Sequence, residues 1–382
     1  MKRSEPHPLH VSVIGISDDA MGLIRAAIRT ESQLPMRAAP YAAGSDDVVC
    51  RESGLVLIGL DEDRKLALEL AQKLIRQNAE IRLIGISLRE ERLGVLEALR
   101  AGLSEYLLLP RDAETLRRSI HPRHLSEMSH PGNLIAILGS KGGCGVSTIS
   151  VHLAAQLATM HRVCAVDMDF GMGDVAALLS LEPESSIQAL LSNLAELNQR
   201  SLLRSVSVHP SHVHVLPQPS FPEDPQNMSR SDLRSTDVLH LLDLLRDGYQ
   251  HIFLDCSGAL DLPTLCSLRE ADQIWLICTP DVLSVRNTWR RLRLLDQMGI
   301  ARDRVRLIVN RWREGAPLSL DDIENNLEVA ISGKIREDRA TVEQAATRGV
   351  LIRQLNEHSP FHLDIAQCAS LIVQAAARQS RS

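Results

Sequence analysis

The sequence predicts an α/β protein with two parallel-sheet domains. Short apolar runs alternate with amphipathic segments along most of the 382 residues, and this alternation is typical of parallel strands joined by helices. A segment rich in proline and histidine separates two such blocks. The predicted organisation is a disordered N-terminus at 1–8, a first domain at 9–120, a linker at 121–132 and a second domain at 133–382.

The first block contains four apolar runs, and each is followed by a segment with helical spacing. Because these runs are apolar at nearly every position, their sheet should be covered by helices on both faces. We expect strands at 9–16, 55–60, 81–87 and 106–109, and helices at 19–30, 64–78, 91–101 and 112–120.

The order and length of this block resemble a flavodoxin-like response-regulator receiver domain. Receivers need an acidic pair after the first strand, a phosphate-accepting aspartate after the third, and a lysine before a late proline. Gly15 and Ile16 stand in place of the acidic pair, Gly59 in place of the acceptor, and Leu109 in place of the lysine. We therefore expect a pseudo-receiver used for docking or dimerisation. Acids that a shifted register would use instead are Asp18, Asp19, Asp61 and Asp63.

A glycine-rich segment opens the second block, between an apolar run at 133–138 and a helical segment at 149–159. Strand, glycine-rich turn and helix form the context of a phosphate-binding loop, in which backbone N–H groups and the helix N-terminus attract an anion. The alternative is a glycine-rich turn without a ligand. The predicted nucleotide-binding residues here are Ser140, Lys141, Gly142, Gly143, Cys144, Gly145, Val146, Ser147 and Thr148.

This loop departs from the pattern G-x-x-x-x-G-K-[ST], because Val146 occupies the lysine position. It resembles the deviant loop K-G-G-x-G-K-[ST] of the MinD/ParA family without its second lysine. The resemblance implies that Lys141 reaches across an ATP-bound dimer to the partner's phosphates. Loss of one contact to the transition state typically costs ~3 kcal/mol, on the order of 100-fold in rate. We expect ATP binding and ATP-favoured dimerisation, with slow or absent hydrolysis.

Acidic residues end two later strands, at the edge of the sheet where open α/β folds bind ligands. The strand predicted at 162–170 carries Asp167 and Asp169, and the strand at 250–258 carries Asp255 in the manner of a Walker B segment. The resemblance to MinD/ParA proteins implies a Mg²⁺ site formed by Ser147, Asp167 and Asp255. It also implies that Asp169 positions the attacking water.

The strand predicted at 304–311 ends in Asn310 and Arg311, which we expect to bind the nucleotide, with Asn310 as the residue that recognises the base. In the family the asparagine hydrogen-bonds adenine, and an amide can donate to and accept from a base edge at once. The alternative is an asparagine that caps the strand end. Residues 335–338 occupy the later purine loop, where relatives often read I-P-x-D, but the proline is missing.

A pseudo-receiver joined to a MinD/ParA-type P-loop domain with an altered loop resembles the CpaE/TadZ family of Flp (type IVb, tight-adherence) pilus assembly proteins. Segments 169–176, 319–324 and 341–350 are also similar to that family. The resemblance implies a homodimer that uses ATP and Mg²⁺ as a switch. It further implies that the protein marks a cell pole or membrane site and recruits the pilus secretion ATPase and inner-membrane platform proteins.

Composition limits the other functions. Aromatic residues make up only 3% and the net charge is −6, which argues against a nucleic-acid platform of stacked aromatics. The seven cysteines include no C-x-x-C pair, so neither a disulfide framework nor a zinc site is expected. We expect no signal peptide, and no apolar run has membrane-spanning length. A reduced, cytoplasmic protein is expected, located at a pole or peripherally at the inner membrane at most.

Two other functional classes stay open, DNA segregation in the manner of ParA and membrane positioning in the manner of MinD. An arginine-rich region at 286–313 could follow DNA phosphates, although solvated helices also carry arginines. The tail at 361–378 has helical apolar spacing but lacks the basic face of a membrane helix, so we expect it to pack in the core. Histidines at 209, 212 and 214 alternate as on a strand surface, where a metal site is the alternative.

Overall fold

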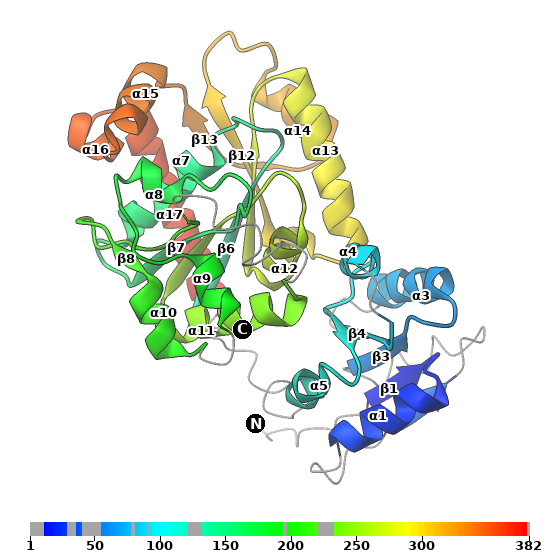
Figure 1. Ribbon diagram of the computed structural model, residues 1–382. Helices are drawn as coiled ribbons and strands as arrows, with labels where there is room; N and C mark the ends of the chain where they lie inside the picture. The colour runs from blue at the N-terminus through cyan, green and yellow to red at the C-terminus, as the bar shows by residue number, and fades with distance from the viewer. Residues whose placement is uncertain are drawn as a thin grey trace, which may run out of the picture. The chain divides into compact units, whose positions relative to one another are not determined.

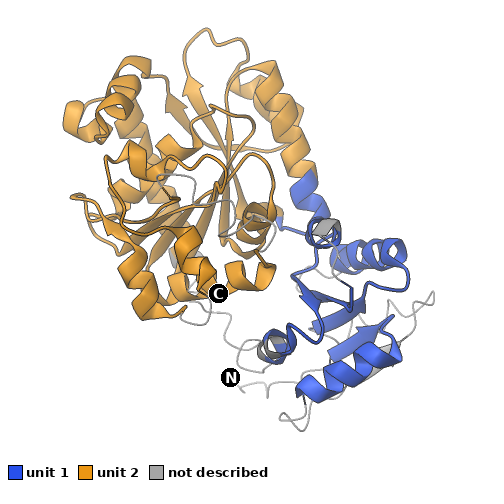
Figure 2. Cartoon of the chain, viewed as in Figure 1, with its two compact units in different colours: residues 1–128, 294–301 blue, residues 129–293, 302–382 orange. Residues whose placement is uncertain are grey.

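The computed structural model describes residues 11–28, 36–39, 55–77, 81–89, 92–120, 132–193, 197–219 and 233–379. The chain divides into two compact units, 1–128 with 294–301 and 129–293 with 302–382 (Figure 2). A five-stranded sheet lies in the first unit and an eight-stranded sheet in the second. The predicted segments at 1–8 and 121–131 lie outside the described residues.

The sheet of the first unit is parallel throughout, in the order β2-β1-β3-β4-β5. Its strands bury apolar side chains on both faces. One cluster joins Val13 and Leu57 to Ile24, and the other joins Ile58 to Leu74. The elements are β1 (Val11–Ile14), α1 (Asp18–Ile28), β2 (Met36–Ala39), β3 (Leu55–Gly59), α3 (Arg64–Gln77), β4 (Arg82–Ser87), α4 (Arg92–Arg100), β5 (Glu105–Leu108) and α5 (Ala113–Ile120).

The four strands and four helices predicted for this unit are therefore present, with small shifts at their ends. The edge strand β2 was missed, because Met36–Ala39 contains no β-branched or aromatic residue.

The sheet of the second unit has the order β13-β12-β11-β6-β10-β7-β9-β8, and all its pairs are parallel except β8 with β9. Its strands are β6 (Asn133–Gly139), β7 (Val163–Asp167), β8 (Ser207–Val208), β9 (His214–Leu216), β10 (His251–Asp255), β11 (Gln273–Cys278), β12 (Val305–Trp312) and β13 (Ile331–Arg336). Its helices are α7 (Val146–Leu157), α8 (Val175–Leu178), α9 (Ile187–Ser192), α10 (Gln199–Ser205), α11 (Ser235–Gly248), α12 (Leu262–Glu270), α13 (Val282–Gln297), η2 (Arg302–Arg304), α14 (Leu320–Leu327), α15 (Arg339–Arg348), α16 (Ile352–Leu355) and α17 (Pro360–Gln379).

Helices α7 and α17 pack against each other over one face of this sheet (Figure 1). Ile135 and Ile137 of β6 point into their core, because alternate residues of a strand face the same side. Phe361, Ile365 and Ile372 of α17 are buried in the same core, which confirms the predicted packing of the tail. Among the described helices, none combines the length and the apolar character that crossing a bilayer requires.

Three predicted boundaries in this unit are wrong. Helix α7 begins at Val146 rather than Ile149, because the glycine-rich loop leads directly into its first turn. Strand β7 ends at Asp167, so the residues after it form a loop. Strand β12 runs on to Trp312, so Asn310 lies inside the strand and not at its end.

Candidate functional site

The glycine-rich loop connects the buried strand β6 to the N-terminus of α7. Gly143 and Gly145 have φ angles of +73° and +98°, in the left-handed region that favours glycine. A Cβ added to Gly142 or Gly143 would meet nothing within 4 Å, so this part of the loop faces open space. The loop thus has the local geometry of an anion site at a helix N-terminus.

The two residues that open the loop are bonded to the start of α13. Lys141 Nζ forms an ion pair with Asp281 Oδ2 at 2.8 Å, and Ser140 Oγ lies 2.7 Å from Ser284 Oγ. Thr279 Oγ1 donates to the same Asp281 oxygen at 2.7 Å. Burial would raise the pKa of Asp281, but these donors outweigh burial and hold the pKa below its ordinary value. The lysine predicted to reach a partner's phosphates is therefore held within its own chain.

Val146 packs inward from the first position of α7. Its side chain is partly buried against the core beneath the helix, and its Cγ2 would lie 2.8 Å from a Cβ on Gly139. An isopropyl group carries no hydrogen-bond donor. Val146 therefore supplies packing at the position where a lysine would supply charge.

Three residues predicted to bind Mg²⁺ come together beside α7. Asp167 and Asp255 end the neighbouring strands β7 and β10 and are register partners. They are only 1% and 3% exposed. Ser147 and Ser150 both hydrogen-bond the Asp255 carboxylate, the latter at 3.0 Å. Burial raises the pKa of Asp255 to about 6, partly offset by the two serine hydroxyls.

The pKa of the neighbouring Asp167 is raised as well. Burial first, and the charge of Asp255 second, raise the pKa of Asp167 well above its usual value. Its carboxylate accepts hydrogen bonds from the backbone N–H of Asp169 at 3.1 Å and of Val175 at 3.2 Å. Two buried carboxylates whose charges repel form an oxygen-ligand site that a hard cation such as Mg²⁺ fits.

Such a site would need ligands from outside the protein. No group of three or more His, Cys, Asp or Glu side chains within the described ranges is arranged to hold a metal ion. With two carboxylates and the Ser147 hydroxyl, the remaining positions would fall to phosphate oxygens and water.

Asp169 lies in the loop after β7 and folds back on that loop. Its Oδ1 accepts hydrogen bonds from the backbone N–H groups of Gly171 at 2.9 Å and Met172 at 3.1 Å. This carboxylate therefore shapes the turn that follows Asp167. It lies two residues beyond the end of β7, and not in the strand as predicted.

Asn310 ties β12 to the glycine-rich loop. Its Nδ2 donates to the carbonyl oxygen of Cys144 at 2.8 Å, and its Oδ1 accepts from the backbone N–H of Arg311 at 2.9 Å. A Cβ on Gly145 would approach that Nδ2 to 2.5 Å, so glycine is required there for close packing as well as for φ. The Nδ2 group of Asn310 can donate one further hydrogen bond, and its Oδ1 can accept one more.

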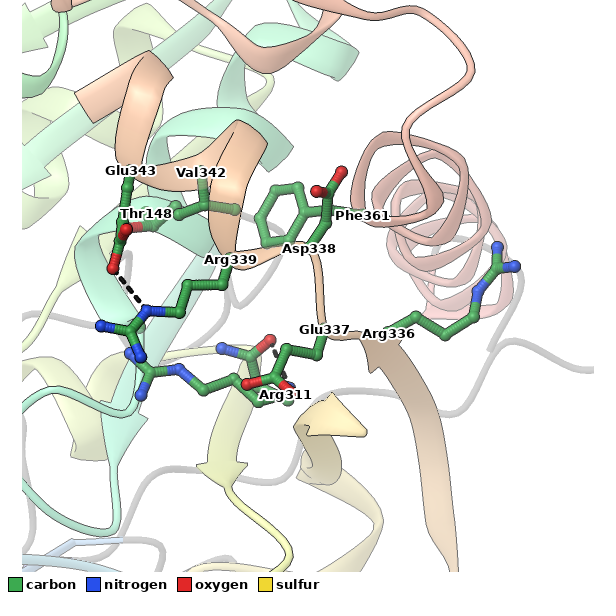
Figure 3. Close-up of a pocket in the computed structure, with 11 residues that line it drawn as sticks. Thr148, Arg311, Arg336, Glu337, Asp338, Arg339, Val342, Glu343 and Phe361 are labelled. Carbon is green, nitrogen blue, oxygen red and sulfur yellow. Dashed lines mark hydrogen bonds and ion pairs between the residues drawn. The ribbon is translucent and has the colours of Figure 1, made fainter. Parts of the chain in front are cut away.

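A cavity of about 290 Å³ opens beside Asn310 and Arg311 (Figure 3). Polar side chains line one part of it, and Val342 and Phe361 provide apolar walls. Arg311 and Arg339 extend toward the same side of the cavity, where Arg339 pairs with Glu343 at 2.6 Å. The full lining consists of Gly145, Thr148, Asn310, Arg311, Arg336, Glu337, Asp338, Arg339, Val342, Glu343 and Phe361.

The predicted purine loop at 335–338 does contribute to this cavity, although it lacks the proline of the family pattern. Asp338 has a structural role there, because it accepts hydrogen bonds from Ser359 Oγ at 2.5 Å and from the backbone N–H of Thr341 at 3.4 Å. The sequence interpretation missed Arg339, Val342 and Phe361. The spacing Asp338-x-x-Thr341, typical of a helix N-cap, was the signal that α15 starts at the site.

The histidines at 209 and 214 have protein partners. His209 Nδ1 lies 2.8 Å from Ser211 Oγ, and His214 Nδ1 lies 3.0 Å from Tyr249 OH. His214 lies on β9 and is half-buried, as a strand-surface histidine would be. His209 follows β8 and is buried, so the strand-surface prediction is wrong for this residue.

Comparison with known proteins agrees with this geometry. Residues 135–351, more than half of the chain, match the family model of the CobQ/CobB/MinD/ParA nucleotide binding domain. The chain belongs to this family. The matched range contains the glycine-rich loop, both buried acids and Asn310.

Individual members of the CobQ/CobB/MinD/ParA family are distant relatives of this chain. The septum site-determining protein MinD of Synechocystis sp. is 26% identical over 215 residues, which cover 55% of this chain and 77% of that protein. A ParA family ATPase from Chlorobium tepidum superimposes with a TM-score of 0.57 at 20% identity, covering 63% and 98% of the two chains. MinD of Pyrococcus horikoshii, solved with Mg-ADP, superimposes with a TM-score of 0.54 at 20% identity, and the match covers 63% of this chain and 96% of that chain. At these identities the structural likeness concerns the fold.

Proposed function

We propose that this chain is an ATP- and Mg²⁺-binding switch in the assembly and localisation of Flp-type pili. ATP would favour a homodimer, and hydrolysis would be weak or absent. The observation that carries the proposal is the edge of the large sheet. The open glycine loop, the two buried acids and the cavity are all found at this edge. In the same loop, Val146 replaces the second lysine.

Nucleotide binding is supported by the geometry at both ends of the site. The cavity is lined by the apolar side chains of Val342 and Phe361 and by the amide of Asn310, a combination that suits a flat base. The buried acids suit a cation that would also contact phosphates. MinD of Pyrococcus horikoshii was solved with Mg-ADP, and the fold is shared.

Weak hydrolysis follows from Val146 and Lys141. Without a cation at Val146, the charge that builds up on the phosphates in the transition state loses one stabilising contact. Lys141 could replace it, but only after leaving Asp281. Backbone N–H groups and Mg²⁺ would still bind the ground state, so binding suffers less than turnover.

A pseudo-receiver role is proposed for the first unit. Its strand order 2-1-3-4-5 is the flavodoxin-like one. A Cβ on Gly59, the residue at the phosphate-acceptor position, would come within 1.8 Å of the carbonyl oxygen of Gly15. The Asp61 carboxylate accepts hydrogen bonds from Ser87 Oγ at 2.5 Å and from the backbone N–H of Leu88 at 2.7 Å. These contacts argue against phosphorylation of the first unit, and docking is the role that we propose for it.

The two alternative functions receive less support from the same contacts. Several arginines of the 286–313 region are used within the fold, since Arg291 donates to the Gly258 carbonyl and Arg306 to the Asp303 carbonyl. Arg313 pairs with Glu337. The apolar side of α17 is buried in the core, which leaves little of it for a membrane.

Titration of the full chain with ATP and Mg²⁺, followed by calorimetry and by mass in solution, tests the switch. We expect heat of binding, a shift to twice the monomer mass, and little phosphate release. No heat at millimolar ATP would overturn nucleotide binding. Rapid turnover that Asp169→Ala abolishes would overturn the weak hydrolysis.

The pilus role needs a separate experiment in the source cells. Deletion of the gene should abolish surface pili and disperse the pilus secretion ATPase from its site. Unchanged pili with faulty chromosome or plasmid inheritance would support DNA segregation instead. A division-site defect together with liposome binding by the purified chain would support MinD-like positioning.

A further inference from the structure

The first three turns of α13 expose an unusual combination of side chains. Val282, Leu283 and Trp289 are 67%, 64% and 47% exposed, and they make up three of the nine large apolar residues exposed among the described residues. Between Val282 and Arg293 the sequence has four arginines and no acidic residue, although the whole chain carries a net charge of −6. This face is therefore basic and apolar in a chain that is acidic overall.

The orientation of this face is fixed by the buried side of the same helix. Ser284, Val285, Thr288 and Leu292 are buried against the domain. Exposed residues therefore recur three or four positions apart and form a stripe along the helix. The stripe, named here the α13 face, consists of Val282, Leu283, Arg286, Trp289, Arg290 and Arg293.

The charges of the α13 face are not neutralised by the parts of the chain that the structure describes. No ion pair of those parts includes Arg286, Arg290 or Arg293. The guanidinium of Arg293 lies 5.2 Å from the centre of the Trp289 ring, which holds the indole against the helix surface. Arg290 makes only a long contact of 3.4 Å with Asn287. The face is preorganised and lacks counter-charges.

We propose that the α13 face docks an acidic, amphipathic segment of a partner protein. Tryptophan and arginine are the residue types that contribute most to protein interfaces when they become buried. Arginine binds carboxylates through paired hydrogen bonds, so glutamates spaced along a helix would match Arg286 and Arg290. Apolar residues of the same segment would cover Val282, Leu283 and Trp289. This inference goes beyond the proposed nucleotide switch and does not depend on it.

Three other occupants fit the α13 face less well. A second copy on a two-fold axis would bring the same arginines of both chains together, and like charges repel. DNA phosphates would neutralise the arginines but leave the apolar side chains uncovered. A membrane would need a broader apolar surface than three side chains.

Binding of a designed peptide to the full-length chain tests the proposal. The probe is a fluorescent peptide of about four helical turns with Leu and Glu on one face. We expect binding that weakens as salt rises, and no binding of a peptide with the same residues in scrambled order. Both peptides are measured with and without Mg·ATP, so that a loss of nucleotide binding does not obscure the result.

Paired variants locate the binding. Arg286→Glu with Arg290→Glu should weaken peptide binding by at least about tenfold, and Trp289→Ala by a similar factor. The matched control is Arg200→Glu with Arg204→Glu on α10, which reverses two exposed arginines at the same spacing and should leave binding unchanged. A peptide with Lys in place of Glu should bind the Arg286→Glu, Arg290→Glu variant more tightly than it binds the natural chain.

Several outcomes would overturn the proposal. They are no binding of the acidic peptide, equal binding by the Trp289→Ala variant, or loss of binding in the α10 control. Binding only to duplex DNA or to vesicles that contain phosphatidylglycerol would also overturn it. So would variants that change only the mass of the chain in solution, since the occupant would then be a second copy. Circular dichroism of each variant confirms that the fold is retained.

Discussion

The ion pair between Lys141 and Asp281 leads to a quantitative prediction about nucleotide affinity. If Lys141 contacts phosphate in the ATP-bound dimer, it must first leave Asp281. Asp281→Asn removes the attraction but keeps an oxygen that can accept the backbone N–H of Ser284, now at 3.0 Å. We therefore expect this substitution to tighten the binding of Mg·ATP.

The size of the effect follows from the exposure of the pair. Both side chains are 36% exposed and their charged atoms are 2.8 Å apart. Pairs of this kind contribute about 0.5–1 kcal/mol after solvent screening. Removing that cost corresponds to roughly two- to fivefold tighter binding, since about 1.4 kcal/mol equals a tenfold change.

Isothermal calorimetry with Mg·ATP at low and high salt measures this change. The control is the double-mutant cycle with Lys141→Ala, in which Asp281→Asn should have no further effect. The gain should also shrink as salt rises, because salt already weakens the pair. Weaker binding by Asp281→Asn, or an equal gain without Lys141, would refute the reasoning.

Three further predictions concern the loop and its helix. Val146→Lys should raise ATP turnover on the order of 100-fold, measured as phosphate release. It should also lower the free energy of unfolding by ~1 kcal/mol, measured by thermal unfolding, because the isopropyl group that is lost is partly buried. Unchanged turnover would contradict the role of Val146. Gly145→Ala should lower the free energy of unfolding by at least about 1 kcal/mol, because Gly145 has a positive φ and a Cβ there would approach Asn310. Gly142 faces open space, so Gly142→Ala should leave the free energy of unfolding unchanged. Burial lowers the pKa of His152 to about 4 in the folded chain, whereas its ordinary value is 6.5. As the pH falls, the unfolded chain therefore takes up this proton before the folded chain does, and the free energy of unfolding decreases between about pH 6.5 and pH 4. Chemical denaturation at several pH values should show a shallower slope in His152→Gln, and an unchanged slope would contradict the assignment.

Most of the fold could be predicted because its strands are apolar on both faces. Runs such as Leu55–Gly59 and Asn133–Gly139 are buried along their whole length, and no helix pattern competes with them. The end of β12 could not be predicted in this way. Its pairing with β13 shifts register between Val309 and Trp312, and Arg311 has a φ of +56°. The predicted strand ends at Arg311, one residue before Trp312, and no local pattern indicates this irregularity.

The two halves of the site differ in how well the sequence predicts them. Asp167 and Asp255 follow apolar strands, and parallel strands bring such residues to one edge. The cavity wall instead depends on α15 and on Phe361 of α17, whose apolar residues look like ordinary core positions. The ion pair of Lys141 joins residues 140 positions apart. Local patterns contain no information about such contacts.

The buried acids give a last prediction, in which stability and binding change in opposite directions. The folded-state pKa of Asp255, about 6, lies above its ordinary value of 3.8, so ionisation at neutral pH works against folding. Asp255→Asn removes that penalty, and an amide oxygen can still accept from Ser150. The nucleotide-free variant should therefore melt at a higher temperature than the natural chain at pH 7, and the difference should vanish below about pH 4.

Added Mg·ATP reverses this order. The natural chain should gain thermal stability with ligand concentration, because a cation offsets the repulsion between the two carboxylates, whereas Asp255→Asn should gain much less. Ser150→Ala is a control that removes a hydrogen bond to Asp255 but keeps the charge. A lower melting temperature of nucleotide-free Asp255→Asn at pH 7 would mean that the carboxylate stabilises the fold. The pair would then be a structural feature and not a site that awaits a cation.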